Sequence, residues 1–173
     1  MKNIIAFSGS NSSTSINTQV LNYIAKVADG VEMIQLTDYE IPMYGIDLEQ
    51  SAGVPADIIA LQEKMMAADA VIMTTPEHNS LMPAFFKNIL DWLSRTGVKY
   101  LENKPVIVMS VSPGGGGGKN AGDYVQKIVG YAGANIVGRF IVPGFNQNFD
   151  VNTQEIVNQE LNDELMGYLA KLQ

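Results

Sequence analysis

Two hydrophobic patterns alternate along this chain. Short apolar segments predict five strands, at residues 3–8, 31–36, 70–75, 106–111 and 134–142. Most of these segments are continuously apolar, which is typical of strands that are covered on both faces of a parallel sheet. Between them, apolar residues recur at helical spacing. A strand followed by a helix, repeated five times, predicts the α/β fold class.

The helical patterns differ in the width of their apolar face. We predict helices at residues 16–28, from Pro55 onward, from Pro83 onward, around residues 124–132 and at residues 153–172. In the helix after Pro83, Phe85, Phe86 and Trp92 make more than one face apolar. Because a single sheet covers only one face of a helix, we expect part of this helix to contact another subunit.

Five strand–helix units suit the doubly wound strand order 2-1-3-4-5. We therefore expect a three-layer sandwich with a five-stranded parallel sheet, as one domain over residues 1–173. In this order the first and third strands are neighbours, and ligands bind in the crevice outside their carboxyl ends. Three loops reach this crevice, at residues 9–15, 76–82 and 113–118. The connection at residues 37–54 could be an ordinary long loop or could have a functional role. Loops of this length in compact domains are often functional.

Charge and composition exclude several function classes. The formal net charge is −7, so the basic surface of a nucleic-acid-binding protein is missing. There is no polybasic segment that would hold an anionic membrane. Without cysteine, and with a single histidine, thiolate catalysis and clustered histidine or cysteine metal sites are not expected. We see no signal-peptide pattern and no apolar run that would span a bilayer, so we expect a cytoplasmic protein.

The first loop is small, rich in hydroxyl groups and directly N-terminal to a helix. Such a position favours an anion, because the helix presents free backbone N–H groups and the positive end of its dipole. The sequence matches neither the G-x-x-x-x-G-K-[ST] nor the G-x-G-x-x-G pattern. A monophosphate held by neutral donors therefore fits the loop better than a triphosphate with magnesium. The alternative is a solvated turn with a serine N-cap.

The other two loops each allow a ligand interpretation and a structural one. Glu77 could accept a hydrogen bond from a ligand ring N–H, or pair with Lys87. Asn79 could bind ligand or cap the turn that follows, and His78 could be catalytic or an ordinary loop residue. The glycines of residues 113–118 allow close approach to a flat ligand or make a flexible surface loop. No nucleophile–base arrangement is visible, which suits a protein whose chemistry belongs to a cofactor.

Three segments resemble one known family. FSGSNSSTSIN resembles the G-S-x-R-x-x-S-x-N loop of the NAD(P)H-dependent FMN reductases, and PEHNSLMPAFFKNILDWLSR resembles their P-E-Y-N-x-x-x-P-x-x-L-K-N-x-I-D-W segment. SVSPGGGGG resembles their glycine-rich third loop. The resemblance implies a flavodoxin-like fold, non-covalently bound FMN, and NADPH or NADH as electron donor. It also implies a homodimer or homotetramer.

The resemblance assigns residues to the cofactor by position. The FMN phosphate would be held by Ser10, Ser15 and Asn17, with Ser8 and Ile16 as further cofactor contacts. Around the isoalloxazine ring and ribityl chain it would place Pro76, Glu77, His78, Asn79, Ser112, Pro113, Gly114 and Gly115. No side chain is assigned a catalytic role, because the chemistry would be centred on the flavin.

Two positions depart from the family's pattern. Ser12 stands where the family usually has arginine, so the phosphate would depend on hydroxyls, amides and the helix dipole. His78 stands where the family usually has tyrosine. A histidine titrates near neutral pH, so flavin affinity or potential could vary with pH.

The resulting hypothesis is ping-pong transfer of electrons from NAD(P)H, through FMN, to quinones, azo compounds, free flavin or similar small acceptors. Two alternatives remain open at this stage. One is a flavin-binding electron carrier without its own NAD(P)H activity. The other is a phosphate- or nucleotide-binding regulatory domain that uses no flavin.

Overall fold

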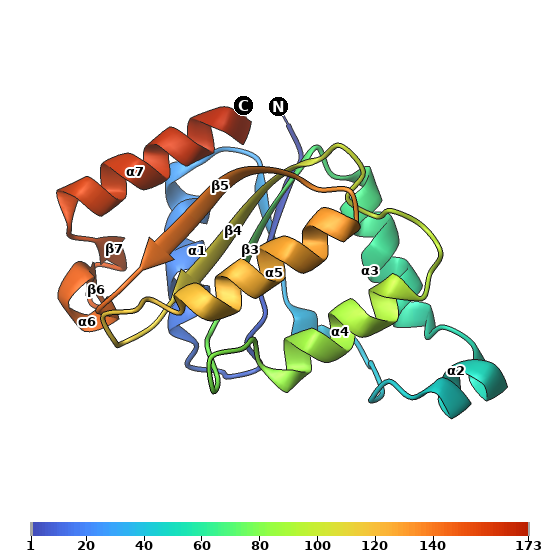
Figure 1. The fold of residues 1–173 in the computed structure, drawn as a ribbon. Coiled ribbons are helices and arrows are strands. Elements are labelled where there is room, and N and C mark those ends of the chain that lie inside the picture. Colours follow the sequence, from blue (N-terminus) through green and yellow to red (C-terminus); the bar gives the residue numbers. More distant parts are fainter. Residues whose placement is uncertain (1, 173) are drawn as a thin grey trace.

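The computed structural model describes residues 2–172 and is built on a five-stranded parallel sheet (Figure 1). Its strands are β1 (Ile4–Ser8), β2 (Val31–Ile34), β3 (Ala70–Thr75), β4 (Pro105–Val111) and β5 (Asn135–Val142). They pair in the order β2-β1-β3-β4-β5, and every pairing is parallel. The predicted strand order is confirmed. The carboxyl ends of β1, β3 and β4 therefore lie side by side at one edge of the sheet.

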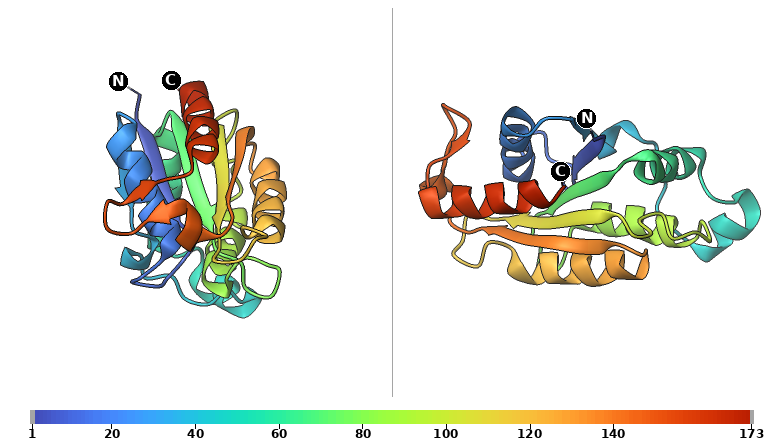
Figure 2. Two further views of the ribbon diagram at one scale, coloured as in Figure 1. Left: turned by 90° about the vertical axis from the view of Figure 1, so that its left-hand side faces the viewer. Right: turned by 90° about the horizontal axis from the view of Figure 1, so that it is seen from above.

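Helices cover both faces of the sheet (Figure 2). One layer contains α1 (Ile16–Val27) and α7 (Gln159–Leu169), and the other contains α3 (Ala56–Ala67), α4 (Ala84–Ser94) and α5 (Lys119–Tyr131). Successive side chains of a strand point to opposite faces. In β1, Ile4 and Ala6 pack in the α1/α7 layer, whereas Ile5 and Phe7 pack in the other. This alternation divides the apolar core into two clusters, one on each face.

Strand β5 carries an irregularity that reverses this alternation. Val106 pairs with Ile136, but the next residue, Ile107, pairs with Gly138, so Val137 is an extra residue in β5. An extra residue turns every later side chain to the opposite face. As a result, Gly138 lies against α7, and the following residue, Arg139, faces α5.

The C-terminal region differs from the predicted helix at residues 153–172. Helix α7 begins only at Gln159, where the Asn158 side chain accepts a hydrogen bond from the Leu161 N–H and caps the helix. Before it come α6 (Phe145–Asn148) and a short antiparallel pair of strands, β6 (Phe149–Asp150) and β7 (Glu155–Ile156). After it comes the short helix η2 (Ala170–Leu172). The prediction was wrong because Ile156 packs into the core from this hairpin and not from a helix.

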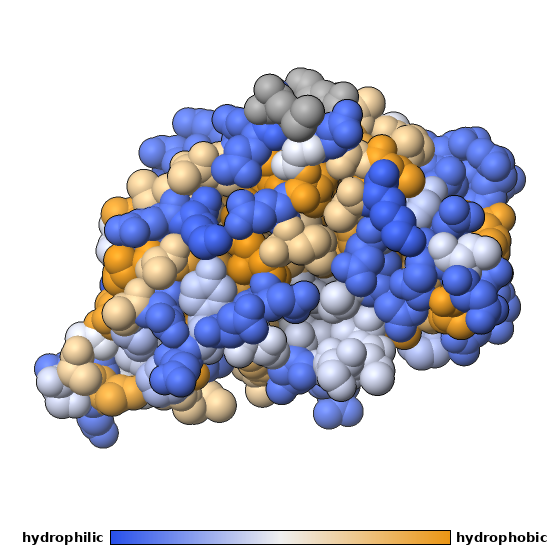
Figure 3. Space-filling view, turned by 180° about the vertical axis from the view of Figure 1, so that it is seen from behind, coloured by the Kyte–Doolittle hydropathy of each residue, from blue (hydrophilic) through white to orange (hydrophobic). Residues whose placement is uncertain are grey.

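The connection at residues 37–54 is also more ordered than predicted. It contains the end of η1 (Leu36–Asp38) and the helix α2 (Ile46–Ala52), which buries none of its residues. Together these residues form an arm that protrudes from the body (Figure 1; Figure 3). Its base is fixed to α4, because the side chains of Asn88 and Trp92 both donate to the Pro42 carbonyl.

This arm explains the wide apolar face of α4. Phe86 and Trp92 are fully buried within the described chain, and the ring of Tyr44 meets that of Trp92 edge-on, with centroids 5.0 Å apart. The chain itself therefore covers this part of the apolar face, while Phe85 remains partly exposed, so the expected contact with another subunit stays a prediction. Within residues 2–172 no helix is long and apolar enough to cross a membrane.

The first loop depends on close contact with α4, and this generates a test. A Cβ atom at Gly9 would lie 2.4 Å from Cδ1 of the buried Phe86 ring. We expect Gly9→Ala to lower the free energy of unfolding by about 1–3 kcal/mol, the size typical of overpacking. Chemical denaturation of the cofactor-free protein measures this change.

The matched control is Gly45→Ala, because an added Cβ there meets nothing within 4 Å. Its effect should stay within about 0.5 kcal/mol. Equal effects of the two substitutions would contradict the packing argument.

Candidate functional site

The loops that follow β1, β3 and β4 meet at the lower edge of the sheet in Figure 1. The Gly9 N–H donates to the Thr74 carbonyl over 2.8 Å, which joins the first loop to the end of β3. The Asn17 side chain donates to the Val111 carbonyl over 3.3 Å, which joins the start of α1 to the end of β4. The structure therefore brings together the three loops that the sequence analysis selected.

The first loop is ordered by its own hydroxyl groups. The Ser8 hydroxyl accepts from the Ser10 N–H, the Ser10 hydroxyl from the Ser12 N–H, and the Ser12 hydroxyl from the Thr14 N–H. These donor–acceptor distances are 3.2, 3.2 and 3.3 Å. A hydroxyl that accepts in this way keeps its own proton. These bonds hold the loop in shape and leave the hydroxyl protons of Ser8 and Ser10 available to an anion, while the Ser12 and Thr14 hydroxyls also bond to each other over 3.3 Å.

The same loop leads into the N-terminus of α1. The Ser15 hydroxyl accepts from the Thr18 N–H over 3.2 Å, as an N-cap does. The N–H groups of Ile16 and Asn17, in the first helical turn, have no intrahelical acceptor. The Asn17 side chain is only 1% exposed and turns inward to β4. At Asn17, therefore, the backbone N–H and not the side chain is available at the N-terminus of α1.

Residues 76–82 form a tight turn. His78 and Leu81 exchange both backbone hydrogen bonds, at 2.8 and 3.1 Å. The two residues between them, Asn79 and Ser80, have left-handed backbones with φ of 52° and 66°. Asn79 therefore serves the turn, and α4, whose N-cap residue is Pro83, has no side-chain cap. The side chains of His78, Asn79 and Ser80 are exposed at the edge that carries the loops.

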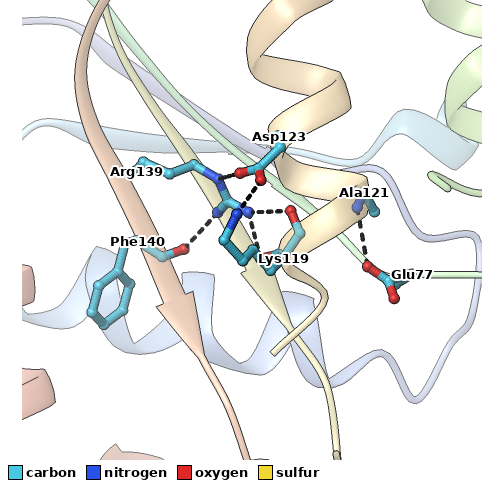
Figure 4. A network of polar contacts seen from close by, with 7 residues as sticks. Glu77, Lys119, Ala121, Asp123, Arg139 and Phe140 are labelled. Atoms are coloured by element: carbon cyan, nitrogen blue, oxygen red, sulfur yellow. Dashed lines mark hydrogen bonds and ion pairs between the residues drawn. The ribbon is translucent and has the colours of Figure 1, made fainter. Parts of the chain in front are cut away.

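Glu77 has a structural partner, but not the one considered from the sequence. Its carboxylate accepts from the Ala121 N–H over 3.0 Å, in the first turn of α5 (Figure 4). Lys87 pairs instead with Asp91 on its own helix. A carboxylate at a helix N-terminus is stabilised by the unpaired N–H groups and the dipole. Glu77 therefore ties the second loop to the start of α5, directly after the third loop.

The glycine loop is anchored at its start by hydrogen bonds and at its end by the buried Gly117 and Gly118, and it is open in between. The Ser112 and Gly114 carbonyls accept from the N–H groups of Phe145 and Gly144, both over 3.0 Å. Added Cβ atoms at Gly115 and Gly116 would meet nothing within 4 Å. Pro113, Gly114 and Gly115 are exposed. The middle of this loop thus offers unhindered backbone to a ligand, while its fixed ends argue against a freely flexible loop.

Behind this loop lies a charged cluster that the sequence analysis missed. The Arg139 guanidinium donates to Asp123, to the Ser110 hydroxyl and to the carbonyls of Lys119 and Phe140 (Figure 4). Lys119 also pairs with Asp123. The Lys119 hydrogen bond, aided by the charge of Arg139, lowers the pKa of Asp123. The sequence did contain a signal for this cluster, because Arg139 is the one charged residue in the otherwise largely apolar strand β5.

The geometry fits a phosphate-bearing, flat cofactor. The first loop provides hydroxyl and N–H donors at a helix N-terminus, and the third provides backbone that a planar ring can approach closely. Among the described residues, the Asn17 Oδ1 and Thr74 Oγ1 atoms are buried without a hydrogen-bond partner, and both lie near this edge. The site's own residues therefore suit a nucleotide with one phosphate group.

These features define a class of protein: an α/β protein of flavodoxin-like fold whose loops at the carboxyl ends of its strands fit a mononucleotide. The solved structure of FerB, the flavoenzyme NAD(P)H:(acceptor) oxidoreductase of Paracoccus denitrificans, has the same fold. It matches with a TM-score of 0.78 and 24% identity, covering 99% of this chain and 95% of that one.

The family follows from the sequence. The model of the NADPH-dependent FMN reductase family matches residues 2–147, so this chain belongs to that family. A quinone reductase of Escherichia coli K12 is 32% identical over 171 residues, which cover 96% of this chain and 91% of the relative. A quinone reductase of Pseudomonas putida is 33% identical over 121 residues, covering 69% and 64%. The chain is an oxidoreductase of this family, with FMN as cofactor and NAD(P)H as electron donor.

Proposed function

We propose that this protein reduces quinones, azo compounds, free flavin or similar small acceptors with electrons from NADPH or NADH, in a ping-pong cycle. The observation that carries the proposal is the meeting of loops at the carboxyl ends of β1, β3 and β4: the first supplies hydroxyl donors at a helix N-terminus, and the glycine loop after β4 offers unhindered backbone. The acceptors are proposed from the family and from relatives named quinone reductases.

The cofactor's phosphate is assigned to the first loop. Ser8, Ser10, Ser15 and Ile16 would contribute hydroxyls and backbone N–H groups, and Asn17 would contribute its N–H rather than its inward-facing side chain. Ser12 supplies no positive charge. Binding would therefore rest on hydrogen bonds to a charged group and on the dipole of α1.

The ring and ribityl chain are assigned to the other two loops. Contacts would come from Pro76, Glu77, His78, Asn79, Ser112, Pro113, Gly114 and Gly115. Because the Glu77 carboxylate is held by Ala121, its contribution would be to fix the loop. The unhindered N–H groups of Gly114 and Gly115 would face the polar edge of the ring.

The chain's residues act by placement and electrostatics. When bound, FMN would supply the redox chemistry between NAD(P)H and the acceptor, and the chain's residues would hold and orient it. The glycine loop would offer backbone donors that stabilise negative charge developing at the ring's polar edge. The turn at His78–Leu81 holds one side of the site in a fixed geometry, so that successive substrates meet the ring in one orientation.

We further propose that one FMN-binding domain assembles into a homodimer or homotetramer in the cytoplasm, where NAD(P)H is available. The protruding arm supports an assembly. Its Met43 and Ile46 side chains are 71% and 50% exposed, and α2 buries no residue. Apolar residues displayed in this way are suited to contact with another subunit.

The first test separates a reductase from an electron carrier. Purified protein is loaded with FMN and mixed anaerobically with NADPH or NADH, while the flavin absorbance is followed in a stopped-flow instrument. We expect bleaching on the timescale of turnover, followed by recovery when a quinone is added, with parallel lines in double-reciprocal plots.

Two results would contradict the proposal. Slow bleaching with both nicotinamides would make the protein a carrier. Failure of the protein to bind FMN would instead favour a regulatory domain without flavin.

The second test concerns the phosphate loop. We expect Ser15→Ala to weaken FMN binding by about 1–3 kcal/mol, as for a hydrogen bond to a charged group. It also removes a helix N-cap, which lowers the free energy of unfolding by about 1 kcal/mol. Fluorescence titration of the FMN-free protein gives the affinity.

Asn158→Ala is the matched control, since Asn158 caps α7 in the same way. It should lower stability similarly and leave FMN affinity unchanged. If Ser15→Ala also leaves the affinity unchanged, the phosphate lies elsewhere.

A further inference from the structure

We infer that Arg139 is a positioning residue of the cofactor site: its guanidinium fixes the junction of the second and third loops and provides positive charge behind the N-terminus of α5. This inference rests on the proposed function, because it concerns the cofactor placed there. Arg139 lies outside the three loops and was not among the candidate residues. Its side chain is only 15% exposed.

The register of β5 determines where this side chain goes. Because Val137 is an extra residue opposite the Val106–Ile107 step, Arg139 faces α5 and not α7. Without the irregularity, the guanidinium would point to the opposite layer. The extra residue therefore delivers a charged side chain to the underside of the third loop.

Gly122 provides the space for the guanidinium. The Nη2 atom of Arg139 occupies this space. A Cβ atom added at Gly122 would lie only 1.8 Å from it. A glycine inside a helix costs about 0.5–1 kcal/mol relative to alanine. This destabilising residue stands at the point of α5 where the guanidinium lies closest to the helix backbone. Gly122 and Arg139 thus form a complementary pair.

The guanidinium reaches the site through two bonds. Its Nη2 atom donates over 3.0 Å to both the Ser110 hydroxyl and the Lys119 carbonyl. Gly118, whose left-handed backbone starts α5, lies against Ser110 and near Glu77, since an added Cβ would be 3.2 Å and 3.6 Å from their Cβ atoms. Glu77 bonds to the first turn of α5. Arg139 therefore supports the point where both loops meet the helix.

The charge of the cluster is the second part of the inference. Two cations, Lys119 and Arg139, share the carboxylate of Asp123, and the Glu77 carboxylate lies at the same end of α5, so the cluster contains two charges of each sign. Lys119 is 64% exposed, so solvent screens it, whereas Arg139 is largely buried. Burial lowers the pKa of Arg139 and Asp123 opposes that shift, and a guanidinium keeps its proton at neutral pH. Arg139 therefore offsets the carboxylates of Asp123 and Glu77 beside the third loop, and its removal would leave negative charge that disfavours an electron-rich ring there.

The test compares four variants with the FMN-loaded wild-type protein. Arg139→Met removes charge and donors, Arg139→Lys keeps the charge without the forked donors, and Gly122→Ala displaces the guanidinium. Gly130→Ala is the control on the same helix, because an added Cβ there meets nothing within 4 Å. The measurements are the FMN dissociation constant, the midpoint potential of bound FMN and the stability of the FMN-free protein.

We expect Arg139→Met to raise the FMN dissociation constant by about tenfold and to lower the midpoint potential. Arg139→Lys should restore the potential more fully than the affinity. Gly122→Ala should weaken FMN binding although alanine favours a helix, whereas Gly130→Ala should bind FMN as the wild type does. If Arg139→Met fails to fold, Ser110→Ala, which removes one acceptor of the guanidinium, carries the test with a raised dissociation constant.

Wild-type affinity and potential in Arg139→Met, or in Ser110→Ala where it replaces that variant, would overturn the inference and leave the proposed function intact. Failure of the wild-type protein itself to bind FMN would overturn both. Equal losses in Gly122→Ala and Gly130→Ala would show that the helix, and not the guanidinium, was disturbed, and would also overturn the inference.

Discussion

The site depends on hydroxyl groups that accept a hydrogen bond from the backbone while keeping their own proton. In the first loop this interaction repeats at Ser8, Ser10 and Ser12, each accepting from the N–H two residues further on. The repetition fixes the loop without an arginine. Its consequence is a preorganised set of neutral donors at the start of α1, where the helix dipole already favours an anion. Such donors suit a phosphate group without requiring a salt bridge.

The remaining parts of the site are held relative to this loop by contacts between distant residues. Asn17 connects α1 to β4, and Glu77 connects the second loop to α5. Arg139 supports the same end of α5 from β5. These side chains hold the loops in place and so leave the glycine backbone and the exposed turn side chains for ligand. This division between supporting and exposed groups is consistent with chemistry that belongs to the bound FMN.

The strand order and the location of the site could be predicted because their signals are local. Apolar segments mark strands wherever they pair, and the order 2-1-3-4-5 follows from five alternating units. What failed depended on distant partners. The sequence indicated the nearby Lys87 as a partner of Glu77, but its partner is the Ala121 N–H, 44 residues away. Residues 42–44 cover Trp92, which the pattern alone did not indicate, whereas a subunit contact at α4 stays a prediction. Ile156 fitted a helical stripe but packs from a hairpin. The orientation of Arg139 follows from a pairing irregularity that periodicity does not reveal.

The central claim is that neutral donors, not a cation, hold the cofactor's phosphate, and comparing FMN with riboflavin as ligands tests it most directly. Riboflavin lacks the phosphate, so the FMN-free protein should bind FMN at least about 100-fold more tightly, as expected for several hydrogen bonds to a charged group. Because the protein carries a net charge of −7, added salt screens its repulsion of the phosphate. We therefore predict that the preference for FMN persists as the salt concentration rises. Equal affinity for the two ligands, or a preference that collapses with salt as a surface ion pair would, contradicts this account.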